Sequence, residues 1–471
     1  MTTRVWWLML VVSIALNASC KAPNELFCCL TAEDCEANGV SGETRPCDEG
    51  LACKENACVA ASCSTEGCTE AAPTCETATD TCVGCTDSAE CSRFAETDVC
   101  DTSSGSCVEC LAPSDCEADR PICDGGSCRG CQFDSECDSG ACANDGTCAA
   151  EDAAVYVSPS GTNAGTCTRS APCKTLQFAL TRTTVTRSHL VLAPGTYANV
   201  GLVDISASTT AATQIAIHGG GATLTESGSD GPSMFRLGIQ TTLRDLDISY
   251  GNFGAAIQVE ASTLIERIKI RGLGDGDLSG ISVNGPAIVR DVVIEDAHRG
   301  LQVSSGTLML DGAVLRPRTN GIKAIDNATL EIKNVLIYGG TLAGIDLTDG
   351  SLVGGSIEFV TISNTGSNST TNAGLTCPIS TFPVRSTIIW TPGVARPAAS
   401  NCGFVSTIAG PMGVAGAMNL DPRFVNPASD DYHLGANSPA RDVVDTGPAL
   451  DFERDPRPSG ARFDIGADEA P

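Results

Sequence analysis

Apolar side chains recur at fixed positions between residues 241 and 362. A template of apolar-x-apolar-x-x-apolar-x-apolar, with Thr, Ala or Gly at some first positions, begins at residues 241, 263, 287, 308, 330 and, less regularly, 355. Successive copies start 22, 24, 21, 22 and 25 residues apart. Alternation with a period of two is typical of a strand with one buried face. The two-residue step inside the template predicts a bend that keeps the same face inward.

A second short apolar run accompanies the template in each repeat. These runs lie at 256–259, 280–283, 300–303, 321–324 and 344–347, and a Gly starts all but the first of them. A Gly at this point marks the corner that turns into the next strand. Repeats of twenty-odd residues with about three short strands each stack into a parallel β-helix. We therefore predict an all-β coil over residues 151–410.

The start of this coil carries a different pattern. Residues 155–161 predict a strand and a turn, residues 174–180 have apolar positions at helical spacing, and residues 189–197 predict another strand and turn. This stretch resembles the opening of the pectate-lyase-like right-handed β-helix superfamily, which implies a right-handed coil with a cap. We expect Cys167 and Cys173 to bridge the opening loop, and Cys377 and Cys402 to form the remaining pair.

Residues 411–471 form a block rich in Asp and Pro that predicts loops and turns covering the end of the coil. Its motifs are 421–424 (DPRF), 432–434 (YHL), 438–442 (SPARD), 455–458 (DPRP) and 464–469 (DIGADE). The block resembles the closing segment of bacterial surface β-helices of the choice-of-anchor Q type. It departs from that pattern at Arg441, where an aliphatic residue is usual, and at Asp468, where an aromatic residue is usual.

Residues 20–150 have a different composition from the rest of the chain. They hold 23 of the 27 Cys, and 26 Asp and Glu against 6 Lys and Arg. Units of four Cys begin at Cys63, Cys85, Cys110 and Cys131. Units this short bury little core, so we expect disulfides to hold them together. The units resemble cysteine-rich repeats of myxobacterial surface proteins, which implies a stalk.

Two questions about these cysteines stay open from the sequence. The spacing of Cys82 and Cys85, repeated at the next two unit boundaries, is also that of a zinc ribbon. An export signal, the two further Cys in each unit and the absence of His from residues 20–150 favour disulfides over zinc. The connectivity of the disulfides cannot be read from spacing alone.

Residues 1–19 predict an export signal. Arg4 precedes an apolar run from Val5 to Leu16, which is too short to cross a bilayer. The run ends in Asn-Ala-Ser before Cys20, which resembles a bacterial lipobox and makes Cys20 the predicted lipidation site. The total of 27 Cys is odd, and removing Cys20 leaves an even number. The alternative is ordinary signal-peptidase cleavage, with Cys20 in a disulfide.

The net charge of −28 narrows the range of partners. A nucleic-acid-binding protein needs a basic face, so we expect no nucleic-acid partner. Attraction to an anionic lipid surface is excluded for the same reason, and we expect membrane contact only through the N-terminal lipid. The predicted location is the outer membrane or cell surface, and secretion is the alternative.

Candidate catalytic chemistry is sparse. The sequence Arg267-Ile268-Lys269 matches part of the polygalacturonase signature, but its Gly-His-Gly and paired Asp companions are missing, so we interpret both charges as solvated. Asp275 and Asp277 are candidate calcium ligands, although Asp-Gly is also turn chemistry, which we favour. His298 at a corner could be a base but has no evident partner, and His218, which precedes three Gly, is interpreted as a turn neighbour. We expect no catalytic residue and no cofactor, with calcium as the alternative.

These observations lead to two functional hypotheses. The first is a lipid-anchored surface protein whose β-helix is a structural or binding module for a polysaccharide or another protein. The second is a polysaccharide lyase or glycoside hydrolase that acts on an acidic polysaccharide. The fold alone does not decide between them, because function depends on the site.

Overall fold

The computed structural model describes residues 51–54, 57–60, 63, 67–226, 231, 233–251, 254–274, 276–349, 354–400 and 402–471. The chain divides into two compact units, Met1–Gly130 and Cys131–Pro471. The second unit includes the last cysteine-rich repeat, residues Cys131–Cys148, which we call the cysteine module. The compact coil unit therefore begins before the boundary at 150/151 that composition suggests. Among the described residues, no helix has the length and hydropathy needed to span a bilayer.

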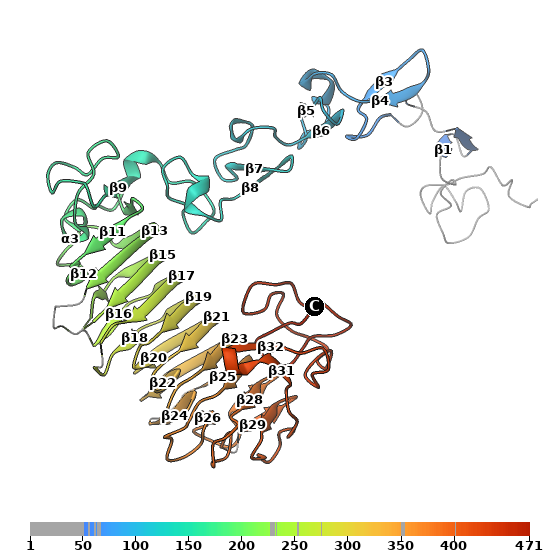
Figure 1. Ribbon diagram of the computed structural model, residues 1–471. Coiled ribbons are helices and arrows are strands. Elements are labelled where there is room, and N and C mark those ends of the chain that lie inside the picture. The colour runs from blue at the N-terminus through green and yellow to red at the C-terminus, as the bar shows by residue number, and fades with distance from the viewer. Residues whose placement is uncertain are drawn as a thin grey trace, which may run out of the picture. The chain divides into compact units, whose positions relative to one another are not determined.

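The first unit is a series of small hairpins. Its strand pairs are β1 (Leu51–Lys54) with β2 (Ala57–Ala60), β3 (Thr74–Glu76) with β4 (Thr81–Val83), β5 (Val99–Asp101) with β6 (Ser106–Val108), and β7 (Ile122–Asp124) with β8 (Ser127–Arg129). Short 3-10 turns precede two of the hairpins, η1 (Ser88–Cys91) and η2 (Pro113–Asp115). Figure 1 shows these hairpins following one another along the chain.

Disulfides join each cysteine-rich repeat in the same way. The first Cys of a repeat bonds the third, and the second bonds the fourth. The pairs are Cys63–Cys75, Cys68–Cys82, Cys85–Cys100, Cys91–Cys107, Cys110–Cys123, Cys116–Cys128, Cys131–Cys142 and Cys137–Cys148. Cysteines with zinc-ribbon spacing therefore belong to different repeats and bond to different partners. Disulfides at this density are typical of extracellular proteins.

The second unit contains a right-handed parallel β-helix, as the sequence predicts. The β-helix has a longer and a shorter sheet. The shorter one, which we call the second sheet, has eight strands in the described part of the chain: β12 (Val203–Ile205), β14 (Phe235–Leu237), β16 (Ala255–Val259), β18 (Ser279–Val283), β20 (Arg299–Val303), β22 (Ile322–Ile325), β24 (Ile345–Asp349) and β26 (Leu375–Thr376). Each strand of this sheet alternates along the chain with strands of a longer sheet (Figure 1).

The longer sheet, which we call the long sheet, has fourteen strands within the described residues. They are β9 (Ala154–Val157), β10 (His189–Leu192), β11 (Thr196–Ala198), β13 (Gln214–Glu226), β15 (Gln240–Tyr250), β17 (Thr263–Gly272), β19 (Ala287–Glu295), β21 (Gly306–Arg316), β23 (Ala328–Tyr338), β25 (Gly354–Ser363), β27 (Pro383–Arg385), β28 (Ile388–Trp390), β29 (Gly403–Val405) and β30 (Ile408–Gly410). Template residues stack in register, for example Leu243 on Ile265 and Ile265 on Val289, and all three are fully buried.

A bend divides each of the central long strands. The bend residue has a left-handed conformation, with φ of 57° at Asp245, 52° at Arg267, 55° at Asp291, 71° at Gly312 and 53° at Asn334. These residues fill the two-residue step of the template. The bend lets the apolar residues before and after it face the same interior, which confirms the predicted role of that step.

The two ends of the coil are closed differently. At the start, helix α3 (Leu176–Leu180) packs on β9 and β12, and a turn, η4 (Glu151–Ala153), precedes β9. At the other end, Val414 and Ala417 pack on the core. The rest of the C-terminal block, residues 411–471, lies against the outward side of the long sheet rather than over the end of the coil. It includes β31 (Phe424–Asn426), η5 (Pro427–Ser429) and β32 (Asp431–Leu434).

Candidate functional site

The outward face of the long sheet carries a row of alternating charge. One outward residue per rung stacks directly on the corresponding residue of the next rung. The signs alternate at every step. This row, which we call the charge ladder, consists of Arg244, Glu266, Arg290, Asp311, Lys333, Glu358 and Arg385. Neighbouring strands lie about 4.8 Å apart, so equal charges recur roughly every 10 Å.

Glu266 is the most enclosed carboxylate of the ladder. Its residue is only 5% exposed, yet its carboxylate faces three guanidinium groups. Arg290 Nε donates to Oε2 at 2.8 Å, Arg267 donates to Oε1 at 3.1 Å, and Arg244 Nε lies 3.2 Å from Oε1. Three arginines around one buried carboxylate compensate the cost of removing that carboxylate from water.

Arg267 lies at the bend beside the ladder. Its guanidinium makes a two-point contact with Asp245, with nitrogen-to-oxygen distances of 2.7 and 2.9 Å. Hydrogen bonding to Asp245 raises the pKa of the Arg267 guanidinium, although burial opposes the shift. The side chain also lies over the ring of Phe133 in the cysteine module. Arg267 is therefore an ion-paired bend residue, in contrast to the freely solvated charge that the sequence suggests.

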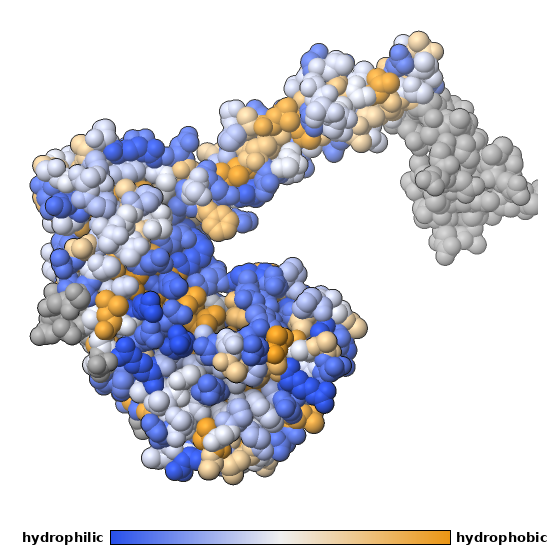
Figure 2. All heavy atoms as spheres, in the orientation of Figure 1, coloured by the Kyte–Doolittle hydropathy of each residue, from blue (hydrophilic) through white to orange (hydrophobic). Residues whose placement is uncertain are grey.

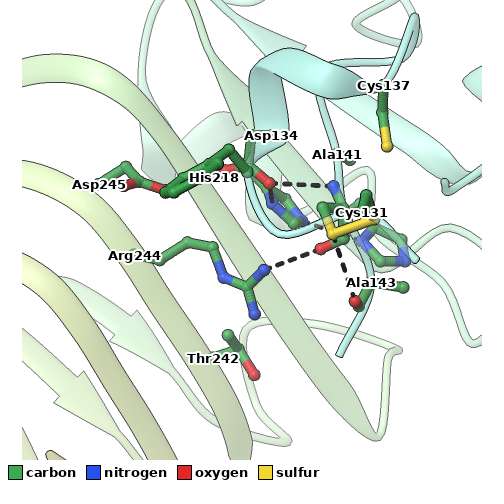
Figure 3. Close-up of polar contacts among 12 residues, drawn as sticks. Cys131, Asp134, Cys137, Ala141, Ala143, His218, Thr242, Arg244 and Asp245 are labelled. Atoms are coloured by element: carbon green, nitrogen blue, oxygen red, sulfur yellow. Dashed lines mark hydrogen bonds and ion pairs between the residues drawn. A yellow bond between two sulfur atoms is a disulfide. The ribbon is translucent and has the colours of Figure 1, made fainter. Parts of the chain in front are cut away.

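The cysteine module covers the first rungs of this face (Figure 3). Its turn η3 (Asp134–Glu136) places Asp134 Oδ1 2.6 Å from His218 Nδ1 on β13, and the same oxygen accepts the backbone N–H of Cys142. Burial raises the pKa of Asp134, but His218 and the Cys142 N–H outweigh it and hold the pKa below its usual value. Arg244 donates to the carbonyl of Cys142 at 2.9 Å.

The C-terminal block contacts the same face further along. The backbone N–H of Gly466 donates to the carbonyl of Ser386, and that of Ala467 donates to Thr361 Oγ1, both at 2.9 Å. Arg454 forms an ion pair with Asp291 at the bend of β19. The cysteine module and the C-terminal block therefore leave an open stretch of sheet between them.

A groove occupies this open stretch. It consists of two adjoining hollows of about 630 and 470 Å³. Figure 2 shows the hollow between the sheet and the C-terminal block lined largely by hydrophilic residues. The groove is lined by ladder residues Glu266 and Arg290, by bend residues Arg267 and Asp291, by Arg454, and by the apolar side chains Phe133, Leu264, Leu450 and Phe452. Glu266 and Asp291 of this lining pair with its arginines.

The structure places some of the predicted site residues and leaves others outside the described residues. Cys167 pairs with Cys173, and Cys377 pairs with Cys402, as the sequence suggests. Cys20, the predicted lipidation site, lies outside the described residues, and so does Asp275. Asp277 Oδ1 lies 2.6 Å from both Arg299 and His298, so its carboxylate faces these two side chains.

Two features of the site, the charge ladder and the His218–Asp134 pair, were not predicted from the sequence. The charge ladder has a signal that sequence reading could have used, because each of its first six members directly follows the second apolar position of a template copy. The buried His218–Asp134 pair gives no such signal. Its members are 84 residues apart and lie in what composition suggests are separate domains. His218 is therefore a buried contact residue, whereas the sequence suggests only a turn neighbour.

No protein-family model matches the chain, and none of the curated proteins matches it. Among solved structures, it is similar to the crystal structure of pectate lyase Pel9A, with a TM-score of 0.43 and 13% sequence identity. The likeness covers 68% of this chain and 100% of that chain. A likeness this remote assigns neither a substrate nor a site, and the β-helix assignment rests on the register of the strands.

Proposed function

We propose that the chain is an exported, lipid-anchored surface protein whose β-helix is a binding module, with the groove as its binding surface. The disulfide-rich first unit supports a location outside the cytoplasm. The lipobox-like sequence before Cys20 supports anchoring there. The hairpin repeats between Cys63 and Cys128 would then be a spacer between the anchor and the β-helix.

The pairing of charged side chains in the groove is the observation that favours binding over catalysis. A glycoside hydrolase needs two carboxylates, one of which stays protonated to act as the acid. A lyase needs a base that is free of its proton at working pH. In the groove, Glu266 and Asp291 each pair with an arginine, Glu453 contacts His433, and Asp145 accepts hydrogen bonds from Thr147, so each carboxylate of the lining already has a partner within the protein.

The same side chains suit a ligand that lies along the sheet. Arg290 is the most exposed arginine of the ladder's open part, and its Nε contact with Glu266 leaves other N–H donors free for a ligand. Leu264 and Leu450 supply apolar surface beside it. We propose an acidic polysaccharide as the ligand, with a protein segment as the alternative occupant.

The test is a binding and degradation assay on the full chain. Acidic and neutral polysaccharides are incubated with the protein, with and without Ca²⁺, and both retention and chain length are measured. We expect retention of at least one acidic polysaccharide with its chain length unchanged. Shortened chains would refute the binding-module proposal, and a new double bond in the products would identify a lyase rather than a hydrolase.

A matched pair of variants locates the binding surface. Arg290→Gln removes a groove arginine, whereas Arg385→Gln removes an arginine of the same ladder that does not line the groove. We expect the first to weaken retention about tenfold, the size of one charge-assisted hydrogen bond, and the second to leave it unchanged. Equal effects of the two variants would move the binding surface elsewhere.

A further inference from the structure

A hydrogen-bonded row of three side chains lies where the cysteine module meets the coil. Asp134 contacts His218, and His218 Nε2 lies 3.0 Å from Nδ1 of His189 on β10. Asp134 and His218 are almost fully buried, whereas His189 is half-buried. The two imidazole rings stack with their centroids 5.2 Å apart. The row therefore leads from a buried carboxylate to an accessible imidazole.

The direction of these hydrogen bonds follows from the carboxylate. An ionised Asp134 only accepts, so His218 Nδ1 donates to it. His218 Nε2 and His189 Nδ1 share the next hydrogen bond, which leaves His189 Nε2 as the ring nitrogen that the row does not use. In the part of the chain that the structure describes, no group bonds to that nitrogen. Burial first and His218 second lower the pKa of His189 to about 4, so the His189 imidazole is neutral at neutral pH and its Nε2 can form one hydrogen bond with a ligand.

His189 lines a cavity of about 480 Å³ beside the cysteine module. Gln214 and Gln240 begin β13 and β15, pair with each other in register, and present exposed amides there. Neither amide has a hydrogen bond to any described residue. Asp145 uses Oδ1 to accept the N–H and hydroxyl of Thr147, which leaves Oδ2 for other donors. The lining includes no Lys and no Arg.

We propose that this cavity binds an uncharged polyhydroxylated ligand, such as a sugar, and that His189 Nε2 forms a hydrogen bond with one of its hydroxyls. Amides both donate and accept, the carboxylate accepts, and the imidazole nitrogen donates or accepts according to its tautomer, which matches hydroxyl groups that do both. A lining without a cation gives an anionic ligand no counter-charge. The volume lies within the range of small-ligand sites. This proposal does not depend on the function of the groove.

The test uses the small number of histidines. The chain has four His, so a full-length protein labelled with ¹⁵N-histidine gives few imidazole signals, which single His→Gln variants assign. Glucose, galactose, mannose, xylose and their disaccharides are titrated at neutral pH. We expect one of them to shift the His189 Nε2 signal in a saturable way and to leave His298 and His433 unchanged. A panel without a saturable His189 shift overturns the proposal.

Two variants of exposed glutamines test whether a shift of the His189 signal has a cause other than binding in the cavity. Gln214→Ala and Gln240→Ala alter only surface amides, so both should fold, and each should weaken the sugar's affinity about tenfold. Gln258→Ala, on the second sheet, is the matched control and should bind like the parent chain. Parent-like affinity in both cavity variants would overturn the proposal even if the His189 signal moves.

Discussion

The hairpin repeats and the β-helix stabilise their short strands in different ways. In the repeat from Cys85 to Cys107, the buried cluster consists of the four cysteines, with Phe94 packed against it. In the β-helix, one continuous core of aliphatic side chains runs through successive rungs, from Val155 to Ala409. Each hairpin repeat therefore depends on its own covalent bonds, whereas each rung of the coil depends on its neighbours.

Reduction of the disulfides should give the largest difference in stability between the two regions. Closing a loop of 11 to 16 residues stabilises a fold by about 3 kcal/mol, and each repeat has two such loops and little other core. We expect reductant to abolish amide protection throughout 63–128, while the rungs from β13 to β25 keep theirs. Hydrogen exchange by mass spectrometry on the full chain measures this. Equal loss in both regions would contradict the comparison.

Glu266→Gln should produce the largest effect of a single substitution in the coil. It removes the carboxylate that three arginines share and leaves Arg244, which is almost fully buried, without its ionic partner. Breaking a buried pair costs about 4 kcal/mol. Urea unfolding of the coil, followed by circular dichroism, measures this change.

Glu358→Gln is the matched control for that substitution. Glu358 belongs to the same ladder, but its partner Arg385 is half-exposed, so the loss should stay below about 1 kcal/mol. If the two variants lost equal stability, burial would not explain the importance of Glu266.

Ile332→Ala tests whether the rungs depend on their neighbours. Ile332 is 1% exposed and stacks between Leu310 and Ile357. Truncating a buried Ile costs about 3 kcal/mol. We expect faster hydrogen exchange in β21, β23 and β25, and unchanged exchange in the hairpin repeats. Exchange that rises only in β23 would show that the rungs are independent.

Asp468→Asn should raise the free energy of unfolding relative to the parent by at most about 3 kcal/mol, and only above pH 4. Burial raises the pKa of Asp468 to about 6, from about 3.9 in the unfolded chain. The folded state therefore holds this proton more tightly, and the stability that it contributes is present below pH 4 and lost as the pH rises through 6. Asn can still accept the Leu434 N–H that the carboxylate accepts.

The measurement for Asp468→Asn compares unfolding midpoints of the variant and the parent from pH 4 to pH 7. The unfolding midpoint of the variant should rise relative to that of the parent across this window, because the variant has no charge to bury. A constant difference across the window would show that the Asp468 carboxyl titrates in the folded state as it does in the unfolded chain.

The fold was predictable because the apolar template that defines it can be recognised within each single repeat. Leu243 and Ile265 occupy the same template position, and each can be recognised from its own copy of the repeat. The charge ladder depends on the same register, but its meaning appears only when Arg244 and Glu266 are stacked, since either charge alone looks like a solvated side chain. The contact of Asp134 with His218 depends on how the cysteine module docks, and no local pattern in the sequence records that.

The pairing of first with third and second with fourth cysteine has a mechanical consequence. A pulling force that enters a repeat at Cys85 reaches Cys107 by two routes: through the Cys85–Cys100 disulfide and along the chain to Cys107, or along the chain to Cys91 and through the Cys91–Cys107 disulfide. The longer segment between Cys91 and Cys100 bears no load, because both routes bypass it. A tether of such repeats would therefore lengthen very little before a covalent bond must break, which suits a protein held at a surface exposed to shear.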